Sequence, residues 1–382
     1  MTEKKRILIL IESYLPGFKN GGHGRTISNL VAFYSDQFDF FIYTSDRDLG
    51  DKTPYPDIDH SKWYDINKSK VKYNNPIKLW FSIGDVINEK KIDIVFSCGL
   101  FSNYTLRLLF DIWSKRINTP IVIAPMGQFG VNALKFKKQI KMSILKVLKR
   151  SNVLERVNWS VTSRFEEVDT LKLLGNVKTY INEDLPFRFD FDLSNKNPKI
   201  VGNLNAVFVS RIHPSKNLME AIHTLKIVSG DVKLDIYGMI ENQTYWNDCK
   251  NEIMKLPKNI KVSYKGSIKP NEVSSIFSKY DVFIFPTLGE NYGHVIFESL
   301  SGACLPIISD QTPWKDLESY ACGSIYPLGD ITKATVIVQQ YVDMESDTLL
   351  NKQKNALAYY KKRFEEKTSS HSFSTMIGAI LE

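Results

Sequence analysis

The sequence has few cysteines and no apolar run of membrane-spanning length. Its four cysteines lie far apart and never form a C-x-x-C pair; they are Cys98, Cys249, Cys304 and Cys322. This pattern argues against a zinc knuckle and against the disulfide framework of a small secreted protein. The longest apolar run near the start, 7–11, ends at Glu12, which is too short for a signal peptide and for the roughly 20 residues that span a bilayer. These absences predict a cytoplasmic protein that is at most peripheral to a membrane.

Composition and charge divide the chain into two halves. A length of 382 residues with 43% hydrophobic and 24% charged residues excludes a disordered or collagen-like protein and predicts two domains of roughly 150–200 residues each. The net charge is +8, and all of it lies in 1–190, which has 29 Lys and Arg against 21 Asp and Glu. We therefore expect the first domain to face something anionic, whether nucleic acid, acidic lipid or a phosphorylated substrate.

Short β-branched and aromatic runs alternate with segments of helical period, which is typical of βαβ units and parallel sheets. Strands are expected in the first half at 6–12, 38–44, 93–98, 119–124 and 158–162, and in the second at 206–210, 232–237, 260–264, 281–286, 305–309 and 324–326. Helices are expected at 26–35, 104–115, 131–150, 218–228, 243–255, 270–278, 293–301 and 314–319. The polar segment 187–203 is the expected linker. Each half is therefore predicted to be a doubly wound α/β domain, and ligands of such sheets bind at the carboxyl ends of the strands.

The strongest motif, Pro-Thr-Leu-Gly-Glu-Asn-Tyr-Gly-His-Val-Ile-Phe-Glu at 286–298, follows an apolar strand and opens a helix. Asn291 can cap that helix, so that the first-turn amides of Tyr292, Gly293 and His294 point outward from its positive end. Such an end is suited to a phosphate. Glu290 and Glu298 could accept hydrogen bonds from hydroxyl groups at two ends of an extended ligand. The alternative is a solvated glutamate in an ordinary loop.

Two cations follow another strand of the same half. Arg211 stands at the end of the strand, and Lys216 stands just before a helix for which Asn217 and Glu220 form a plausible capping box. A guanidinium and an ammonium on the same edge of a sheet are a suitable clamp for a diphosphate, whose negative charge grows when it leaves. Taken alone, an Arg and a Lys near a helix start are usually only solvated.

A glycine-rich loop, 16–25, follows the first strand and contains Gly21, Gly22 and Gly24. It does not fit the dinucleotide fingerprint G-x-G-x-x-G, because Ile27 stands at the third glycine position. We expect a permissive backbone that borders the ligand and offers amides to an anion. A plain surface loop is the alternative.

These loops, in this order, resemble the retaining glycosyltransferases of family 4, which have the GT-B fold of two Rossmann-like domains facing a central cleft. The resemblance covers almost the whole chain and is most specific at 290–298, which is similar to the family's E-x7-E motif. It implies that 1–190 binds the acceptor and that 200–367 binds the donor. A closing helix at about 368–382 is then expected to return to the first domain.

The resemblance also implies roles for single residues. Glu290 and the amides of Asn291, Tyr292 and Gly293 would bind the donor sugar, and Glu298 its ribose hydroxyls. Arg211 and Lys216 match the family's diphosphate-binding pair, while Gly21 and Gly22 match its first glycine loop. Ser163 and Glu166 lie where relatives have a cleft-facing Ser or Thr and a Glu. The chain departs from the family at Met126, where many members carry Arg or His.

The family resemblance implies transfer from a nucleoside-diphosphate sugar without a metal cofactor. Asp-x-Asp occurs at 46–48 and 57–59, and both are expected to be surface loops. In place of Mg²⁺, Arg211, Lys216 and helix-start amides would offset the charge of the diphosphate.

The segment Lys135–Arg150 is strongly basic. On a helical wheel Phe136, Ile140, Ile144, Val147 and Leu148 share one arc, and lysines fill the neighbouring arc. Basic amphipathic helices of this kind bind anionic membranes. An ordinary sheet-packing helix with a basic outer face is the alternative.

The resulting prediction is a retaining, metal-independent glycosyltransferase in which Arg211, Lys216 and Glu290 act on the donor. It would move a hexose or N-acetylhexosamine, with UDP as the expected carrier, to a glycan or undecaprenyl-diphosphate-linked acceptor of an O-antigen or capsule pathway. A sugar-nucleotide epimerase or a phosphorylase-type enzyme of the same fold is one alternative. A non-catalytic nucleotide-sugar or nucleic-acid-binding protein is the other, although no aromatic and basic strand motif for nucleic acid is present.

Overall fold

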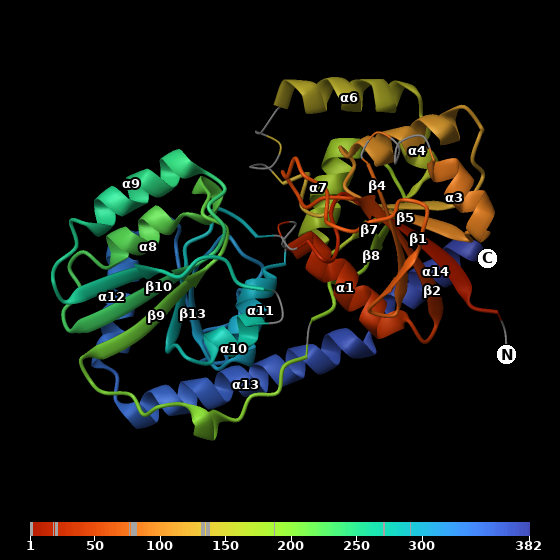
Figure 1. The fold of residues 1–382 in the computed structure, drawn as a ribbon. Helices are drawn as coiled ribbons and strands as arrows, with labels where there is room; N and C mark the ends of the chain where they lie inside the picture. The colour runs from red at the N-terminus through yellow and green to blue at the C-terminus, as the bar shows by residue number, and fades with distance from the viewer. Residues whose placement is uncertain are drawn as a thin grey trace. The chain divides into compact units, whose positions relative to one another are not determined.

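The computed structural model describes residues 3–17, 19, 22–75, 77, 82–130, 134, 138–186, 188–269, 272–290 and 292–382. The chain divides into two compact units, 1–185 with 367–382 and 186–366. Each unit is an α/β domain built on one sheet of mainly parallel strands (Figure 1). The predicted fold class is confirmed.

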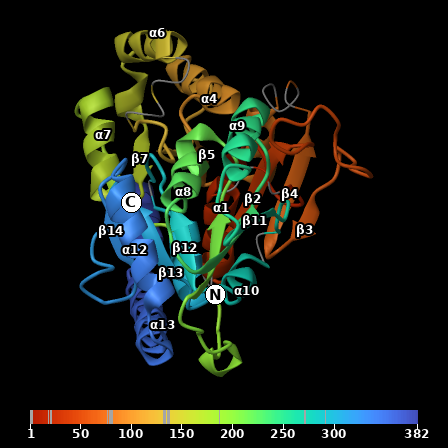
Figure 2. The same cartoon turned by 90° about the vertical axis from the view of Figure 1, so that its left-hand side faces the viewer.

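The first unit has an eight-stranded sheet in the order β3-β4-β2-β1-β5-β6-β7-β8. Its strands are β1 (Lys5–Ile11), β2 (Phe38–Ser45), β3 (Tyr64–Ile66), β4 (Ser69–Asn74), β5 (Ile94–Cys98), β6 (Ile121–Ala124), β7 (Asn158–Val161) and β8 (Thr179–Ile181). Its helices are α1 (Gly22–Tyr34), α3 (Ile83–Lys90), α4 (Asn103–Trp113), α6 (Lys138–Arg150), α7 (Arg164–Leu174) and α14 (Ser372–Leu381). Among the described strands only β3 and β4 pair antiparallel, and they lie at the edge of the sheet beyond β2 (Figure 2).

The C-terminal helix α14 belongs to the core of the first unit. Its Phe373 is fully buried and packs against Tyr34, Phe38, Phe40 and Phe96, with ring centroids 5.2–6.3 Å apart. The last residues of the chain therefore complete a core that the first residues begin.

The second unit has a six-stranded parallel sheet in the order β11-β10-β9-β12-β13-β14. Its strands are β9 (Asn203–Val209), β10 (Asp231–Tyr237), β11 (Ile260–Tyr264), β12 (Val282–Phe285), β13 (Leu305–Ser309) and β14 (Ser324–Tyr326). Its helices are α8 (Leu218–Thr224), α9 (Gln243–Ile253), α10 (Val273–Phe277), α11 (His294–Ser301) and α12 (Ile331–Asp343); the boundary between the units lies within α13 (Ser346–Ser369). Residues of β9, β12 and β13 form its buried centre, because helices cover both faces of these strands.

Four details of the sequence prediction are wrong. Asp46 and Asp48, which were expected in a surface loop, are buried. The segment 314–319 is not a helix, and the strands β3, β4 and β8 were not expected. The predicted capping box is also absent: Asn217 is in the left-handed region with φ 57°, and its side chain donates to the Glu220 carboxylate instead of capping α8. Glu220 accepts a second bond, from the backbone N–H of Gly329, which ties α8 to the loop before α12.

Candidate active site

The strand order of the second sheet reverses between β9 and β12. At such a switch point the loops after the two strands diverge, and the space between them is where ligands of doubly wound sheets bind. Arg211 and Lys216 follow β9, and Glu290 follows β12. The fold therefore brings the three residues predicted to act on the donor to one edge of one sheet.

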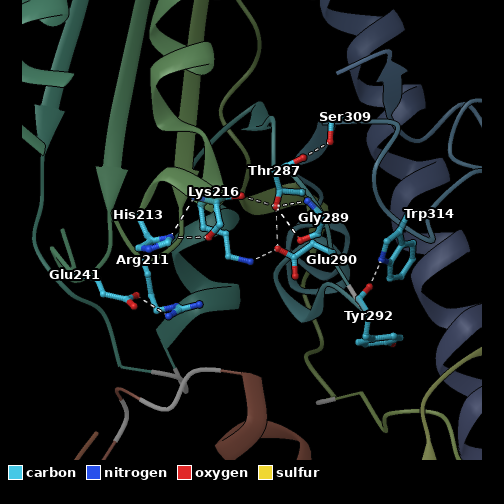
Figure 3. A network of polar contacts seen from close by, with 11 residues as sticks. Arg211, His213, Lys216, Glu241, Thr287, Gly289, Glu290, Tyr292, Ser309 and Trp314 are labelled. Carbon is cyan, nitrogen blue, oxygen red and sulfur yellow. Dashed lines mark hydrogen bonds and ion pairs between the residues drawn. The ribbon is translucent and has the colours of Figure 1, made fainter. Parts of the chain in front are cut away.

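Lys216 and Glu290 form an ion pair across this switch point (Figure 3). Both side chains are 15% exposed, so water screens the pair only in part. The hydroxyl group of the buried Thr287 lies 3.2 Å from the same carboxylate oxygen. The backbone N–H of Leu288 donates to the carbonyl of Ser215 over 2.9 Å and joins the two loops. Lys216 and Glu290 are thus held by contacts on both sides of the switch point.

Arg211 pairs with a carboxylate that the sequence analysis did not single out. Its Nη1 lies 2.5 Å from an oxygen of Glu241, in the segment between β10 and α9. The two side chains are 42% and 37% exposed, so solvent surrounds this pair much more than the pair of Lys216. Glu241 carries no local sequence signal beyond its place after a strand, because Arg211 is 30 positions away in the chain.

His213 shapes the loop that carries Lys216. Its Nδ1 accepts a hydrogen bond of 3.2 Å from the backbone N–H of Ser215 and so caps the 3₁₀ turn Pro214–Lys216. Burial lowers the pKa of His213, and the neighbouring charges of Arg211 and Lys216 lower it further, while Glu241 opposes them. The neutral imidazole, with an unprotonated Nδ1, therefore fits this position. His213 was not among the predicted site residues.

The loop that follows Glu290 is anchored by aromatic side chains. The Nε1–H of Trp314 donates to the carbonyl of Tyr292 over 2.6 Å. Helix α11 begins at His294 with Gly293 as its N-cap, so it starts later than expected; the predicted cap, Asn291, lies outside the described residues. Gly293 has φ 81°, and a Cβ there would lie 3.3 Å from the Trp314 nitrogen. Glu298 lies in the first turns of α11 and is partly buried.

In the first unit, Ser163 and Glu166 make internal hydrogen bonds. Ser163 is the N-cap of α7, where its hydroxyl accepts from the N–H of Glu166 over 3.2 Å. The Glu166 carboxylate is 3% exposed and accepts bonds from Gly127 N–H at 2.6 Å and from the N–H and hydroxyl of Thr162 at 2.8 and 2.9 Å. Burial raises the pKa of Glu166, although these hydrogen bonds oppose the shift.

These bonds fix the turn after β6. Met126 in this turn is in the left-handed region with φ 51°, and its carbonyl lies 3.1 Å from Nε2 of His23 in α1. Gly22 is the first residue of α1, and Gly21 lies outside the described residues. The glycine loop, the turn at Met126 and Glu166 are thereby connected within the first unit.

Two kinds of feature are absent from the described residues. They contain no group of three or more His, Cys, Asp or Glu side chains placed to hold a metal ion. They also contain no helix with the length and apolarity needed to cross a bilayer.

Comparison with known proteins gives a family match for part of the chain and a fold for nearly all of it. Residues 190–363 match the family described as "Glycosyl transferases group 1", whereas no curated protein sequence matches the chain. HepE from Anabaena, solved with UDP and glucose, is similar in structure, with a TM-score of 0.71, 16% identity, and 98% of this chain and 100% of that chain covered. Sucrose-phosphate synthase from Thermosynechococcus elongatus has a TM-score of 0.69 and 14% identity, with 98% of this chain and 100% of that chain covered. WaaG, a glycosyltransferase involved in lipopolysaccharide biosynthesis, has a TM-score of 0.68 and 11% identity, with 96% of this chain and 98% of that chain covered.

Proposed function

Because this chain is a glycosyltransferase with the GT-B fold and a group 1 domain at 190–363, we propose that it transfers a sugar from a nucleoside diphosphate with retention of configuration. The donor sugar is a hexose or N-acetylhexosamine, and UDP is the proposed carrier because HepE was solved with UDP-glucose. The acceptor is a lipid-linked or glycan chain of a surface polysaccharide. The second unit binds the donor, and the first unit binds the acceptor.

The observation that carries this proposal is the position of Arg211, Lys216 and Glu290 around one switch point. When the bond between sugar and diphosphate breaks, negative charge grows on the departing diphosphate. Lys216 has three N–H donors and spends one on Glu290, so two remain for phosphate oxygens. Arg211 supplies further donors from the neighbouring loop. Fixed cations of this kind stabilise a charge that develops in the transition state.

Glu290 has a second task in this proposal. Its carboxylate accepts bonds from Lys216 and Thr287 through one oxygen, Oε1, and Oε2 is the oxygen that we assign to a hydroxyl of the donor sugar. The backbone of Tyr292 and Gly293, held by Trp314, lies next to it in the chain. Glu298 in α11 binds the ribose hydroxyls. Because Arg211, Lys216 and the helix-start amides offset the charge of the diphosphate, we propose that no metal is required.

In the first unit, we propose that the glycine loop at Gly21 and Gly22 and the turn at Met126 border the acceptor. Ser163 and Glu166 then act by holding this turn, because their polar atoms bond to the protein itself.

We further propose that α6 binds an anionic membrane. Only Leu145 of this helix is buried, while Ile140 and Val147 are 60% and 66% exposed. The face expected to pack on the sheet is therefore largely open to solvent, next to Lys138, Lys146, Lys149 and Arg150. Apolar insertion together with basic side chains is what binds a helix to acidic lipid. Sedimentation with vesicles containing an anionic lipid should remove the protein from solution, and Val147→Asp should abolish this, whereas Val336→Asp on α12 should not.

The decisive experiment has two steps. Nucleotide sugars are first screened for a rise in the unfolding temperature, and the best donor is then assayed with undecaprenyl-linked acceptors. Transfer with an unchanged anomeric configuration, also in the presence of a chelator, is the expected result. Arg211→Ala and Lys216→Ala should each reduce turnover at least ~100-fold. Normal rates in both variants would refute the clamp, and conversion of the donor without any acceptor would instead identify an epimerase.

A further inference from the structure

Arg211 is paired with Glu241 on the edge of the proposed diphosphate site, and the backbone builds this pair. The N–H of Ile212 donates to the carbonyl of Met239 over 2.8 Å, and the N–H of Asn242 donates back to the carbonyl of Ile212 over 3.1 Å. The segment that carries Glu241 is thus laid along the segment that carries Arg211.

Gly238 makes this close approach possible. It has φ 146°, and a Cβ at this position would lie 1.7 Å from the carbonyl oxygen of Ser210. Any other residue would push the chain after β10 away from the chain after β9. The position of Glu241 beside Arg211 is therefore a consequence of the fold and not of a chance meeting of two surface side chains.

The pair leaves Arg211 able to bind a second anion. Only Nη1 is engaged by Glu241, and within the part of the chain that the structure describes no contact is made by Nε or Nη2. In Figure 3, Glu241 lies on one side of the guanidinium, and the opposite end points to the side of Lys216 and Glu290. A diphosphate could bind there while Glu241 stays in place. One negative charge then remains close to the bound diphosphate.

This charge acts differently on donor and product. In a nucleoside-diphosphate sugar both phosphates are esterified and carry one charge each. Once the sugar has left, the terminal phosphate regains a second ionisation with a pKa near 6, so the free diphosphate carries about one more negative charge at pH 7. Repulsion from Glu241 is therefore stronger for the product than for the donor.

We propose that Glu241 is a specificity-determining residue that weakens the binding of the nucleoside diphosphate product relative to the sugar-nucleotide donor. This inference rests on the proposed function of the site. The side chains of Arg211 and Glu241 are 42% and 37% exposed, so the effective dielectric constant around them is close to that of water. One additional charge at about 6 Å from a carboxylate then changes the affinity about threefold, and salt reduces the effect.

The test compares dissociation constants by calorimetry at low ionic strength for UDP and UDP-glucose, and for the GDP and ADP pairs. The variants are Glu241→Gln and Glu241→Asp, with Glu252→Gln as the control. Glu252 lies in α9 and pairs with Lys226 and Lys255, so this control removes one negative charge from a different ion pair of the same unit. In Glu241→Gln the product should gain about threefold more affinity than the donor. Glu241→Asp and Glu252→Gln should keep the ratio of the unaltered protein.

An unchanged ratio in Glu241→Gln, or weaker binding of both ligands, would overturn the inference, because Glu241 would then only orient Arg211. An equal change in Glu252→Gln would overturn it as well, since the effect would come from the overall charge. If the unaltered protein binds none of the nucleotides, the proposed function itself fails and this inference falls with it. Binding of the donor with an unchanged ratio refutes only the role of Glu241.

Discussion

The ion pair of Lys216 and Glu290 has two tasks in the proposed site, and a double-mutant cycle separates them. The variants are Lys216→Met, Glu290→Gln and the two together. Each single change leaves one partner without its counter-charge in a place where both side chains are 15% exposed. We expect each to lower the free energy of unfolding by about 1–3 kcal/mol, since a partly buried charge loses its partner. The double variant removes both charges, so it should lose about 1 kcal/mol less than the sum of the single variants.

Activity should not follow stability in this cycle. Lys216→Met removes a donor to the departing diphosphate and should reduce turnover at least ~100-fold. The double variant, although partly restored in stability, should stay as inactive as Lys216→Met. Chemical denaturation measures the free energy of unfolding, and the initial rate of transfer at saturating donor measures turnover.

Lys226 and Glu252 provide a matched control cycle in the same unit. They form an ion pair of 2.6 Å with side chains 39% and 19% exposed, away from the loops after β9 and β12. Their single variants should change the free energy of unfolding by less than about 1 kcal/mol and leave turnover unchanged. A coupling energy near zero between Lys216 and Glu290 would show that the contact does not persist in solution. Recovered turnover in the double variant would show that Lys216 serves the fold and not the diphosphate.

Three further changes test other parts of the site. Glu298→Ala should weaken donor binding with little effect on stability, and an unchanged dissociation constant in calorimetry would remove its ribose role. Glu166→Gln places an NH₂ group against one of the donors Gly127 N–H and Thr162 N–H, so it should lower the free energy of unfolding by about 1–3 kcal/mol. It should also raise the KM for the acceptor. An unchanged KM would show that the turn at Met126 does not border the acceptor. Because the pKa of His213 is lowered in the folded state, its stabilising contribution is present above about pH 6.5. That contribution is lost as the pH falls, and His213→Gln should flatten this part of the stability profile in denaturation at pH 7.5 and 5.5.

The sequence predicted the central strands well because they are buried on both faces. Strands β12 and β13 are buried at every position, so they read as continuous apolar runs. Strand β4, with the sequence Ser-Lys-Val-Lys-Tyr-Asn, alternates polar and apolar residues near the edge of its sheet and was missed. Its partner β3 is joined to it by Asn67 and Lys68, both with positive φ. A two-residue hairpin turn of this kind is recognised mainly from Asn-Gly or Asp-Gly, and Asn-Lys is a weak signal.

The predicted helix at 314–319 failed for a different reason. Trp314 is buried, donates to the carbonyl of Tyr292, and packs against Phe297 and Tyr359 with ring centroids 6.0 and 6.2 Å away. These contacts come from distant parts of the chain and determine the backbone conformation there. A local pattern of apolar residues carries no information about them, because the same pattern would suit a helix packed on the sheet.

The same distinction separates the site residues that could be predicted from those that could not. Arg211 and Glu290 each lie in the loop that follows an apolar strand, so the rule that ligands bind at the carboxyl ends of strands is enough to propose them. Their partners depend on which strands are neighbours. Glu241 meets Arg211 because β10 pairs with β9 and because Gly238 lets the two following segments touch. Strand order is a property of the folded sheet. A residue whose role depends on contact with another loop can therefore be identified only when that order is known.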